Sequence, residues 1–273
     1  MKLALNGATT MYADLETDIK AAAEAGFDYV EIWAAKLRAF LKDKTVEDLA
    51  QLLNNNNIRA YSLNSIENTV FRDAADYAEI KQTCEELSEI ANAINCPYIV
   101  VIPGKLPQNA NEEFIIDESV KVLTELAGIA AKHNIGLAFE FLGQTDCSVQ
   151  TLDLAKVIIE KVDLPNVGLV IDTFHFYAGN STLEAIENLN AKNLFVFHIN
   201  DAEDLPKEQL TDAHRLYPGL GILPIAEIKA RLDRIGYDEV TSVEIFRPEY
   251  WADNPFEVAK NAFDATTKVL NSN

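Results

Sequence analysis

Four acidic or imidazole side chains stand in short apolar runs in the second half of the chain. They are Glu140, Asp172, His198 and Glu244, in the runs Ile135–Phe141, Val167–Asp172, Leu194–Asn200 and Val240–Phe246. Apolar runs of this kind predict fully buried strands of a parallel sheet. Because α/β folds place their sites at the carboxyl ends of such strands, we interpret these four residues as candidates for chemistry.

Three carboxylates and one imidazole make a hard donor set that is rich in oxygen. Carboxylates that are brought together repel one another strongly unless a cation lies among them. The set suits Mn, Mg, Zn, Co or Fe(II), and it lacks the thiolates that a structural zinc site uses. At any single position the residue could instead cap a helix, pair with an arginine or fill the core. The coincidence at four strand ends favours a site for one divalent metal ion.

The elements that would position these residues alternate between strand and helix. Four earlier strands are predicted at Lys2–Asn6, Tyr29–Trp33, Arg59–Asn64 and Tyr98–Ile102. Helices are predicted at Asp14–Ala25, Thr45–Asn54, Asp76–Asn95, Glu113–His133, Ser148–Val162, Leu183–Asn190, Pro224–Ile235 and from Asn254 onward. Eight such units without a linker predict an α/β fold of the (β/α)8 TIM barrel type, with residues 1–273 as a single domain. Strands five to eight are then neighbours, so the four candidates would meet at the carboxyl-terminal mouth.

Composition limits the classes of partner and the cellular compartment that we expect for this protein. The formal net charge of −20 argues against nucleic acid and membrane partners, since both need basic patches. The three cysteines have no close pairs, and no signal peptide or membrane-length apolar run is present, so we expect a cytoplasmic protein with reduced thiols. No Gly-x-Gly-x-x-Gly follows a predicted strand, which disfavours a nicotinamide or flavin site.

Four further residues have weaker signals. His175 lies in the predicted loop just past Asp172, where a substrate contact is expected. Arg215 lies in a later loop, and a cation there could neutralise an anionic intermediate. His133 ends a helix, where it would lie near the helix carbonyls. Trp33 follows the second strand and could line the pocket, fill a loop or contribute to a homo-oligomer contact.

Several segments resemble the xylose isomerase-like TIM barrel superfamily. They are Asn6–Thr10, Phe139–Phe141, Asn166–Phe176, Phe197–Asp204, Pro218–Gly221 and Ser242–Tyr250. The resemblance covers nearly the whole chain, and within the superfamily the chain is most similar to the inosose (2-keto-myo-inositol) isomerases of inositol breakdown.

The resemblance implies a role for each candidate residue. One divalent ion (Mn, Zn, Co or Mg) would be held by Glu140, Asp172, His198 and Glu244. The two glutamates would also act as acid/base groups. The expected substrate-binding residues are His175, Arg215, Asn6 and Trp33. One departure is visible, because Gly7 stands after Asn6 where an acidic residue is expected, and that loop faces the pocket.

The chemistry expected of such a site is proton transfer beside a ketone. A metal ion chelated by a carbonyl and the adjacent hydroxyl acidifies the carbon-bound proton between them, and a carboxylate can remove and return it. We therefore expect a metal-dependent isomerase of a keto-polyol, 2-keto-myo-inositol by the resemblance, that acts through a metal-bound enediolate.

Other functions on the same barrel stay open. Ketose 3-epimerase, hydroxypyruvate isomerase and inosose dehydratase are alternatives, because the residue types at the metal do not separate these outcomes. An apurinic endonuclease is disfavoured, since that class binds three metals with many more histidines than the four present here. A non-catalytic sugar-binding barrel is disfavoured too, because it would tolerate loss of a ligand and all four candidates are intact.

Overall fold

Eight parallel strands close into a barrel in the computed structural model, which describes residues 1–271. The barrel strands are β1 (Lys2–Asn6), β2 (Tyr29–Trp33), β3 (Arg59–Ile66), β4 (Tyr98–Val101), β5 (Gly136–Glu140), β6 (Val167–Asp172), β7 (Leu194–Ile199) and β10 (Val240–Val243). They pair in the order β1-β10-β7-β6-β5-β4-β3-β2. The predicted (β/α)8 barrel is therefore confirmed, and the four strands with candidate residues are consecutive in it.

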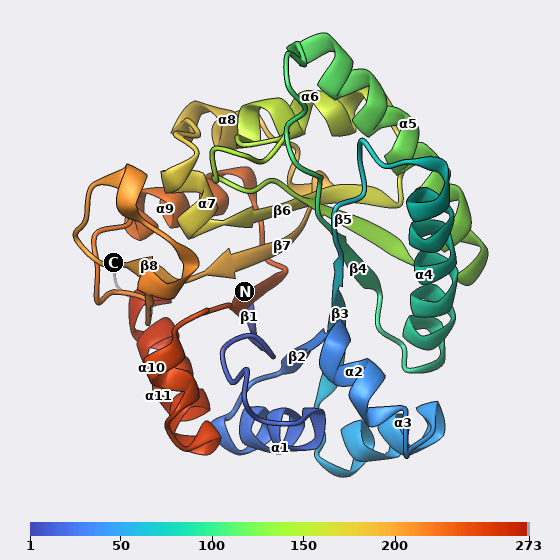
Figure 1. Cartoon of the computed structure of the whole chain (residues 1–273). Coiled ribbons are helices and arrows are strands. Elements are labelled where there is room, and N and C mark those ends of the chain that lie inside the picture. The colour runs from blue at the N-terminus through green and yellow to red at the C-terminus, as the bar shows by residue number, and fades with distance from the viewer. Residues whose placement is uncertain (272–273) are drawn as a thin grey trace.

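Each barrel strand is followed by a helix that packs outside the barrel. These helices are α1 (Leu15–Ala25), α3 (Val46–Asn55), α4 (Ala74–Ala93), α5 (Glu112–Ala130), α6 (Leu152–Val162), α8 (Leu183–Glu187), α9 (Ile225–Ile235) and α11 (Pro255–Leu270). Figure 1 shows them as a ring around the strands, ordered in the sequence of the colour bar. None of the helices in residues 1–271 is long and apolar enough to cross a membrane.

Helix ends follow local signals in the sequence. Thr45 and Asp48 form a reciprocal capping box at the start of α3, as predicted. Gly26 ends α1 with a φ of 101°, a left-handed conformation that glycine adopts without a steric penalty. Asn254 caps α11, and Pro255 occupies its first position, where the missing N–H costs nothing.

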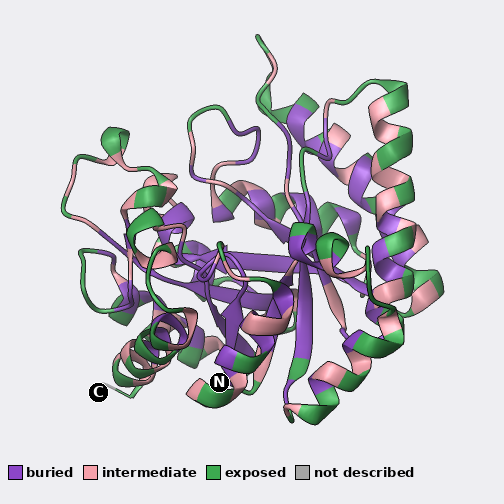
Figure 2. Cartoon of the chain, turned by 60° about the horizontal axis from the view of Figure 1, so that its bottom comes forward, coloured by how far each residue is buried: buried purple, intermediate pink, exposed green. Residues whose placement is uncertain are grey.

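The core has two layers because side chains on each strand alternate in direction. The larger apolar cluster lies between the strands and the helices. A smaller cluster fills the inside of the barrel, where Tyr61, Val170 and Phe195 pack together. In Figure 2 the strands are buried along most of their length, while the ring helices are exposed on their outer faces. The polar residues of the barrel mouth lie directly above this inner cluster.

The helix predicted at Ser148–Val162 begins later than expected. Both the N–H and the hydroxyl of Ser148 donate to the carbonyl of Gly104, 2.9 and 2.8 Å away. These bonds hold the segment against the loop after β4, so α6 begins at Leu152 with Thr151 as its cap. The other predicted ends agree with the structure to within a few residues, as is usual for element boundaries.

The last barrel strand is shorter than its apolar run. It ends at Val243. Two residues later, the backbone N–H of Ile245 donates to the hydroxyl of Thr9, 3.1 Å away. Glu244 therefore lies just past the strand and not within it.

Several short elements were not predicted. They are α2 (Ala34–Phe40), α7 (Thr173–Ala178), α10 (Pro248–Trp251), the strand pair β8 (Asp201–Ala202) and β9 (Arg215–Leu216), and the 3-10 turns η2 (Ala191–Asn193), η3 (Lys207–Gln209) and η4 (Asp212–His214). A further 3-10 turn, η1 (Ala131–His133), forms the end of the helix predicted at Glu113–His133. Two of them change the prediction for a site residue. His175 lies in helix α7 and Arg215 in strand β9, whereas both were expected in loops. In each case the segment is too short to show a periodic pattern.

Candidate metal centre

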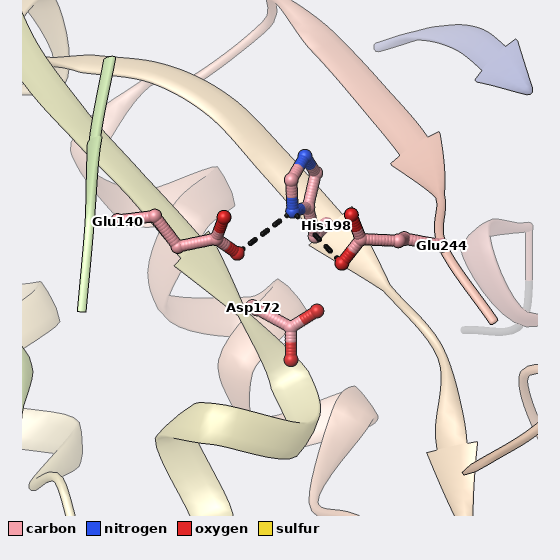
Figure 3. A group of neighbouring side chains, drawn as sticks. All are labelled: Glu140, Asp172, His198 and Glu244. Atoms are coloured by element: carbon pink, nitrogen blue, oxygen red, sulfur yellow. Dashed lines mark hydrogen bonds and ion pairs between the residues drawn. The ribbon is translucent and has the colours of Figure 1, made fainter. Parts of the chain in front are cut away.

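The four predicted ligands lie together at the carboxyl-terminal mouth of the barrel. Glu140, Asp172, His198 and Glu244 are all buried, and one donor atom from each lies within 4.8 Å of the others. Asp172 and His198 are register partners on β6 and β7, so their side chains point to the same side. Figure 3 shows the four side chains directed toward a common centre.

His198 presents one ring nitrogen to this group. Its Nδ1 is 2.9 Å from Oε1 of Glu140 and 3.5 Å from Oε2 of Glu244. Its Nε2 faces the opposite way and lies 3.0 Å from Oε2 of Glu31, a buried carboxylate on β2. A carboxylate on the far nitrogen of a histidine ligand fixes the ring orientation and raises the basicity of the other nitrogen. Nδ1 is therefore the atom that is free to bind an ion.

The pKa shifts of His198 and Glu244 indicate that the four-residue group favours positive charge. Burial lowers the pKa of His198, but Glu31, Glu244 and Glu140 together raise it well above its usual value, so the imidazole is protonated. Burial, aided by the charge of Glu140, raises the pKa of Glu244 to about 8 despite the attraction of His198. In this state, protons on His198 and Glu244 offset part of the negative charge of the group. The donor set therefore fits a divalent cation, which would replace these protons.

Arg215 supplies a second, permanent positive charge. Its fully buried guanidinium donates from Nη1 to Asp172 and Glu244, at 2.9 and 3.1 Å. Nη2 and Nε donate to Asp212, at 2.7 and 3.1 Å. Although burial disfavours its charge, these carboxylates raise the pKa of Arg215 further. Asp212 thus anchors the arginine on one side while the candidate ligands hold it on the other.

The tautomer of His175 follows from its contact with Arg215. Nη2 of Arg215 lies 3.0 Å from Nε2 of His175, and because a guanidinium only donates, Nε2 must accept. Burial lowers the pKa of His175, so its ring is neutral and the proton is on Nδ1. This Nδ1 has no partner among the described residues. It is a buried donor available to a ligand.

A cavity of about 360 Å³ opens above the four residues. Its lining includes Trp33, Asn64, Glu140, His175, Arg215, Glu244 and Phe246. This volume is in the range of small-molecule sites. Asp172 and His198 are not among the lining residues.

The structure places Asn6 against Glu244 and not on the cavity wall. Its Nδ2 donates to Oε1 of Glu244 at 3.0 Å, and its Oδ1 accepts from the N–H of Ala8 at 2.8 Å. The neighbouring Gly7 has little space around it, because a Cβ there would lie 3.1 Å from Oδ2 of Asp18 and from Cβ of Trp33. The acidic residue expected at position 7 would therefore crowd this loop.

Sequence reasoning missed several residues of the site. Glu31 and Asn64 contact the ligand group from β2 and β3, and Asn200 donates to Asp172 at 2.8 Å. One signal could have found Glu31, since Val30-Glu31-Ile32 repeats the pattern of the segment around Glu244. No comparable signal marks Asn64 or Asn200.

His133 lies outside this centre. Its Nε2 is 2.8 Å from Oε1 of Glu85, and with Glu89 these residues form a partly exposed group on the helical surface. Lys132 lies 3.7 Å from the same glutamate and already offers it a positive charge.

Comparisons with known proteins give a consistent result. The sequence model of the family described as Xylose isomerase-like TIM barrel matches residues 19–268. Curated relatives include an inosose isomerase of Halalkalibacterium halodurans, 37% identical over 99% of this chain and 96% of its own length. The inosose isomerase of Bacillus velezensis is 36% identical, over 99% of this chain and 97% of its own length. More distant is an L-ribulose 3-epimerase of Methylomonas, 26% identical over 85% of this chain and 78% of its own length.

Solved structures show the same fold. A crystal structure described as the IolI protein with a bound zinc atom superposes with a TM-score of 0.96 at 36% identity, covering 99% of this chain and 98% of the other. A D-psicose 3-epimerase from Clostridium cellulolyticum has a TM-score of 0.80 at 20% identity, with complete coverage of both chains. At that identity the similarity shows the fold alone.

Proposed function

Because the chain belongs to the xylose isomerase-like TIM barrel family, we propose that it is a metal-dependent isomerase of 2-keto-myo-inositol. The observation that carries the proposal is the buried group of Glu140, Asp172, His198 and Glu244 at the floor of a small-molecule cavity. The full-length similarity to curated inosose isomerases supports the choice of substrate.

We assign one divalent ion to these four side chains. The similar structure with zinc supports that metal, and the donor set also accepts Mn, Co or Mg. When bound, the ion would polarise a ketone and its neighbouring hydroxyl and stabilise the negative charge that develops when the proton between them leaves.

Glu140 and Glu244 are the proposed acid/base groups. Both line the cavity, and they come from β5 and from the end of β10, which β6 and β7 separate in the barrel. Two carboxylates placed in this way can reach a substrate from different sides. One takes a proton from the hydroxyl-bearing carbon next to the ketone. The isomerisation is complete when a proton is returned to the former carbonyl carbon and the hydroxyl proton passes to the former ketone oxygen.

His175 and Arg215 are the proposed partners of the substrate oxygens. His175 offers its unpartnered Nδ1–H, and Arg215 brings a guanidinium to the same wall of the cavity. His175 would donate this N–H and Arg215 would contribute its positive charge, so together they would stabilise an oxygen that gains negative charge as the proton leaves. Asn6 would hold Glu244 in place through its hydrogen bond. Trp33 would supply an apolar part of the cavity wall.

The charge of the cavity favours a neutral substrate. Five acidic residues line it: Glu67, Glu140, Asp146, Asp212 and Glu244. Its two lining cations, Lys105 and Arg215, are already paired with carboxylates. Even with a divalent ion bound, these carboxylates leave the cavity with a net negative charge, which would repel a substrate with its own carboxylate, such as hydroxypyruvate. A neutral inosose or ketose avoids this repulsion.

Ketose 3-epimerase is the second candidate, supported by the similarity to the L-ribulose 3-epimerase. The two activities differ in the carbon that receives the proton. The test is to incubate metal-loaded protein with 2-keto-myo-inositol, other inososes, ketoses and hydroxypyruvate, and to identify products by NMR. We expect a shifted carbonyl in the inosose product. Inversion at a ketose carbon without any turnover of inososes would instead identify an epimerase, and loss of water a dehydratase.

A further inference from the structure

Asn64 on β3 has a buried acceptor without a partner. Its side chain lines the cavity, yet only 1% of the residue is exposed. Its Oδ1 makes no hydrogen bond with any described residue. A buried polar atom left unpaired costs free energy, so such an atom beside a ligand cavity points to a partner that the ligand supplies.

The orientation of the amide is fixed by its neighbours. Nδ2 of Asn64 lies 3.0 Å from Oε1 of Glu244 and 3.3 Å from Oε1 of Glu31. Both contacts are made to carboxylate oxygens, and an ionised carboxylate only accepts hydrogen bonds. The NH₂ group must therefore face the two glutamates. The carbonyl oxygen is turned away from them and can only accept.

Asn64 and His175 thus offer complementary unpaired atoms to one cavity. His175 has a donor, because its Nε2 already accepts from Arg215. Asn64 has an acceptor, and it is carried by β3, far around the barrel from β6 and the helix α7 that follows it. A ligand that satisfies both must present a hydroxyl hydrogen to one side and an oxygen lone pair to the other. A polyol ketone has both groups.

We propose that Asn64 is a specificity-determining residue whose Oδ1 accepts a hydrogen bond from one hydroxyl of the substrate. The inference rests on the proposed function, and it goes further by assigning a hydroxyl to a residue outside the metal ligands and acid/base groups. The site would then select polyols that carry a hydroxyl at one defined ring position and reject analogues without it.

The test combines a variant with altered substrates. For wild type and Asn64→Leu, kcat/KM is measured for the parent inosose and for each of its monodeoxy analogues. Loss of the contact from Nδ2 to Glu244 slows the variant with every substrate equally, so it cancels in the ratio of parent to analogue. In wild type this ratio should be about tenfold or more for the analogue that lacks the recognised hydroxyl, and close to one in Asn64→Leu.

Ser65→Ala is the matched control. Its hydroxyl is also buried without a partner, but Ser65 does not line this cavity. The control should keep the wild-type ratio for every analogue. The proposal is overturned if every analogue gives the same ratio in wild type and in Asn64→Leu, because the orphaned oxygen would then serve only a water molecule or the fold.

The outcome for Asn64 is separate from the outcome for the proposed function. Failure to convert any inosose would contradict the proposed function. The same cycle would then be measured with a ketose that is converted, or, without turnover, as calorimetric binding of myo-inositol and its monodeoxy analogues. Coupling between Asn64 and one hydroxyl in any of these series supports the inference, and its absence, or absence of polyol binding, overturns it.

Discussion

Replacing Glu31 by glutamine separates the orientation of His198 from direct metal ligation. Glu31 is not one of the four assigned ligands, and its carboxylate lies 3.0 Å from Nε2 of His198. It also accepts from the hydroxyl of Ser242 at 2.7 Å. Glutamine has nearly the same shape and can still accept one hydrogen bond from the imidazole. The change therefore removes the negative charge with little change in packing.

The magnitude follows from the geometry. Both side chains have 0% exposure, so solvent does not screen the charge of Glu31 from the ring of His198. Glutamine keeps part of this interaction through its carbonyl oxygen. Loss of a carboxylate partner behind a histidine ligand typically weakens metal binding by about 10- to 100-fold. We expect Glu31→Gln to lower the zinc affinity by that factor.

The assay is competition for zinc with a chromophoric chelator at fixed pH. Glu85→Gln is the matched control, because Glu85 also pairs with a histidine, His133 at 2.8 Å, but far from the centre. Thermal unfolding of the metal-free proteins should show that both variants are folded. A folded Glu31→Gln protein with zinc affinity within about twofold of wild type would refute the role given to Glu31.

Three further predictions concern the ligands and the core. Asp172→Ala should lose the ion that wild type retains through dialysis, because a three-ligand site is weaker and less ordered; full metal content by elemental analysis would contradict the assignment. Since Glu244, with a pKa of about 8, and the protonated His198 must each lose a proton to bind an ion, the metal association constant should rise with pH below pH 8 by up to about a hundredfold per pH unit; calorimetry that finds no pH dependence between 6 and 8 would oppose this. Ile171→Ala, at a fully buried position, should lower the free energy of unfolding in urea by about 2–5 kcal/mol, whereas Val157→Ala, 39% exposed, should change it by no more than about 0.5 kcal/mol; equal effects would be evidence against the two-layer core.

The barrel could be predicted because its strands are buried on both faces. Val167–Asp172 is an apolar run that ends in a carboxylate, and both properties are visible without knowledge of the fold. Parallel strands bring their carboxyl ends to one rim, so the grouping of Asp172 and His198 followed from topology alone. The same reasoning predicted Glu244, although the strand ends before it.

Two kinds of contact could not be predicted from the sequence. One is made by segments that leave the barrel, and the other by polar residues within its strands. Arg215 contacts Asp172, 43 residues away in the sequence, from β9, a two-residue strand that pairs with β8. Asn64 lies in a strand whose pattern shows no chemistry, and its role depends on Glu31 of the neighbouring strand β2. Such contacts depend on barrel register, which periodicity does not give.

The most direct test of the proposed function is turnover of 2-keto-myo-inositol in D₂O by the metal-saturated wild type and by Glu140→Gln and Glu244→Gln. Proton transfer through these glutamates should place solvent deuterium on the product carbon. Each variant should keep a similar KM, while its kcat falls by about 100-fold or more. Complete retention of the original hydrogen, together with substantial turnover in both variants, would contradict the acid/base roles assigned to Glu140 and Glu244.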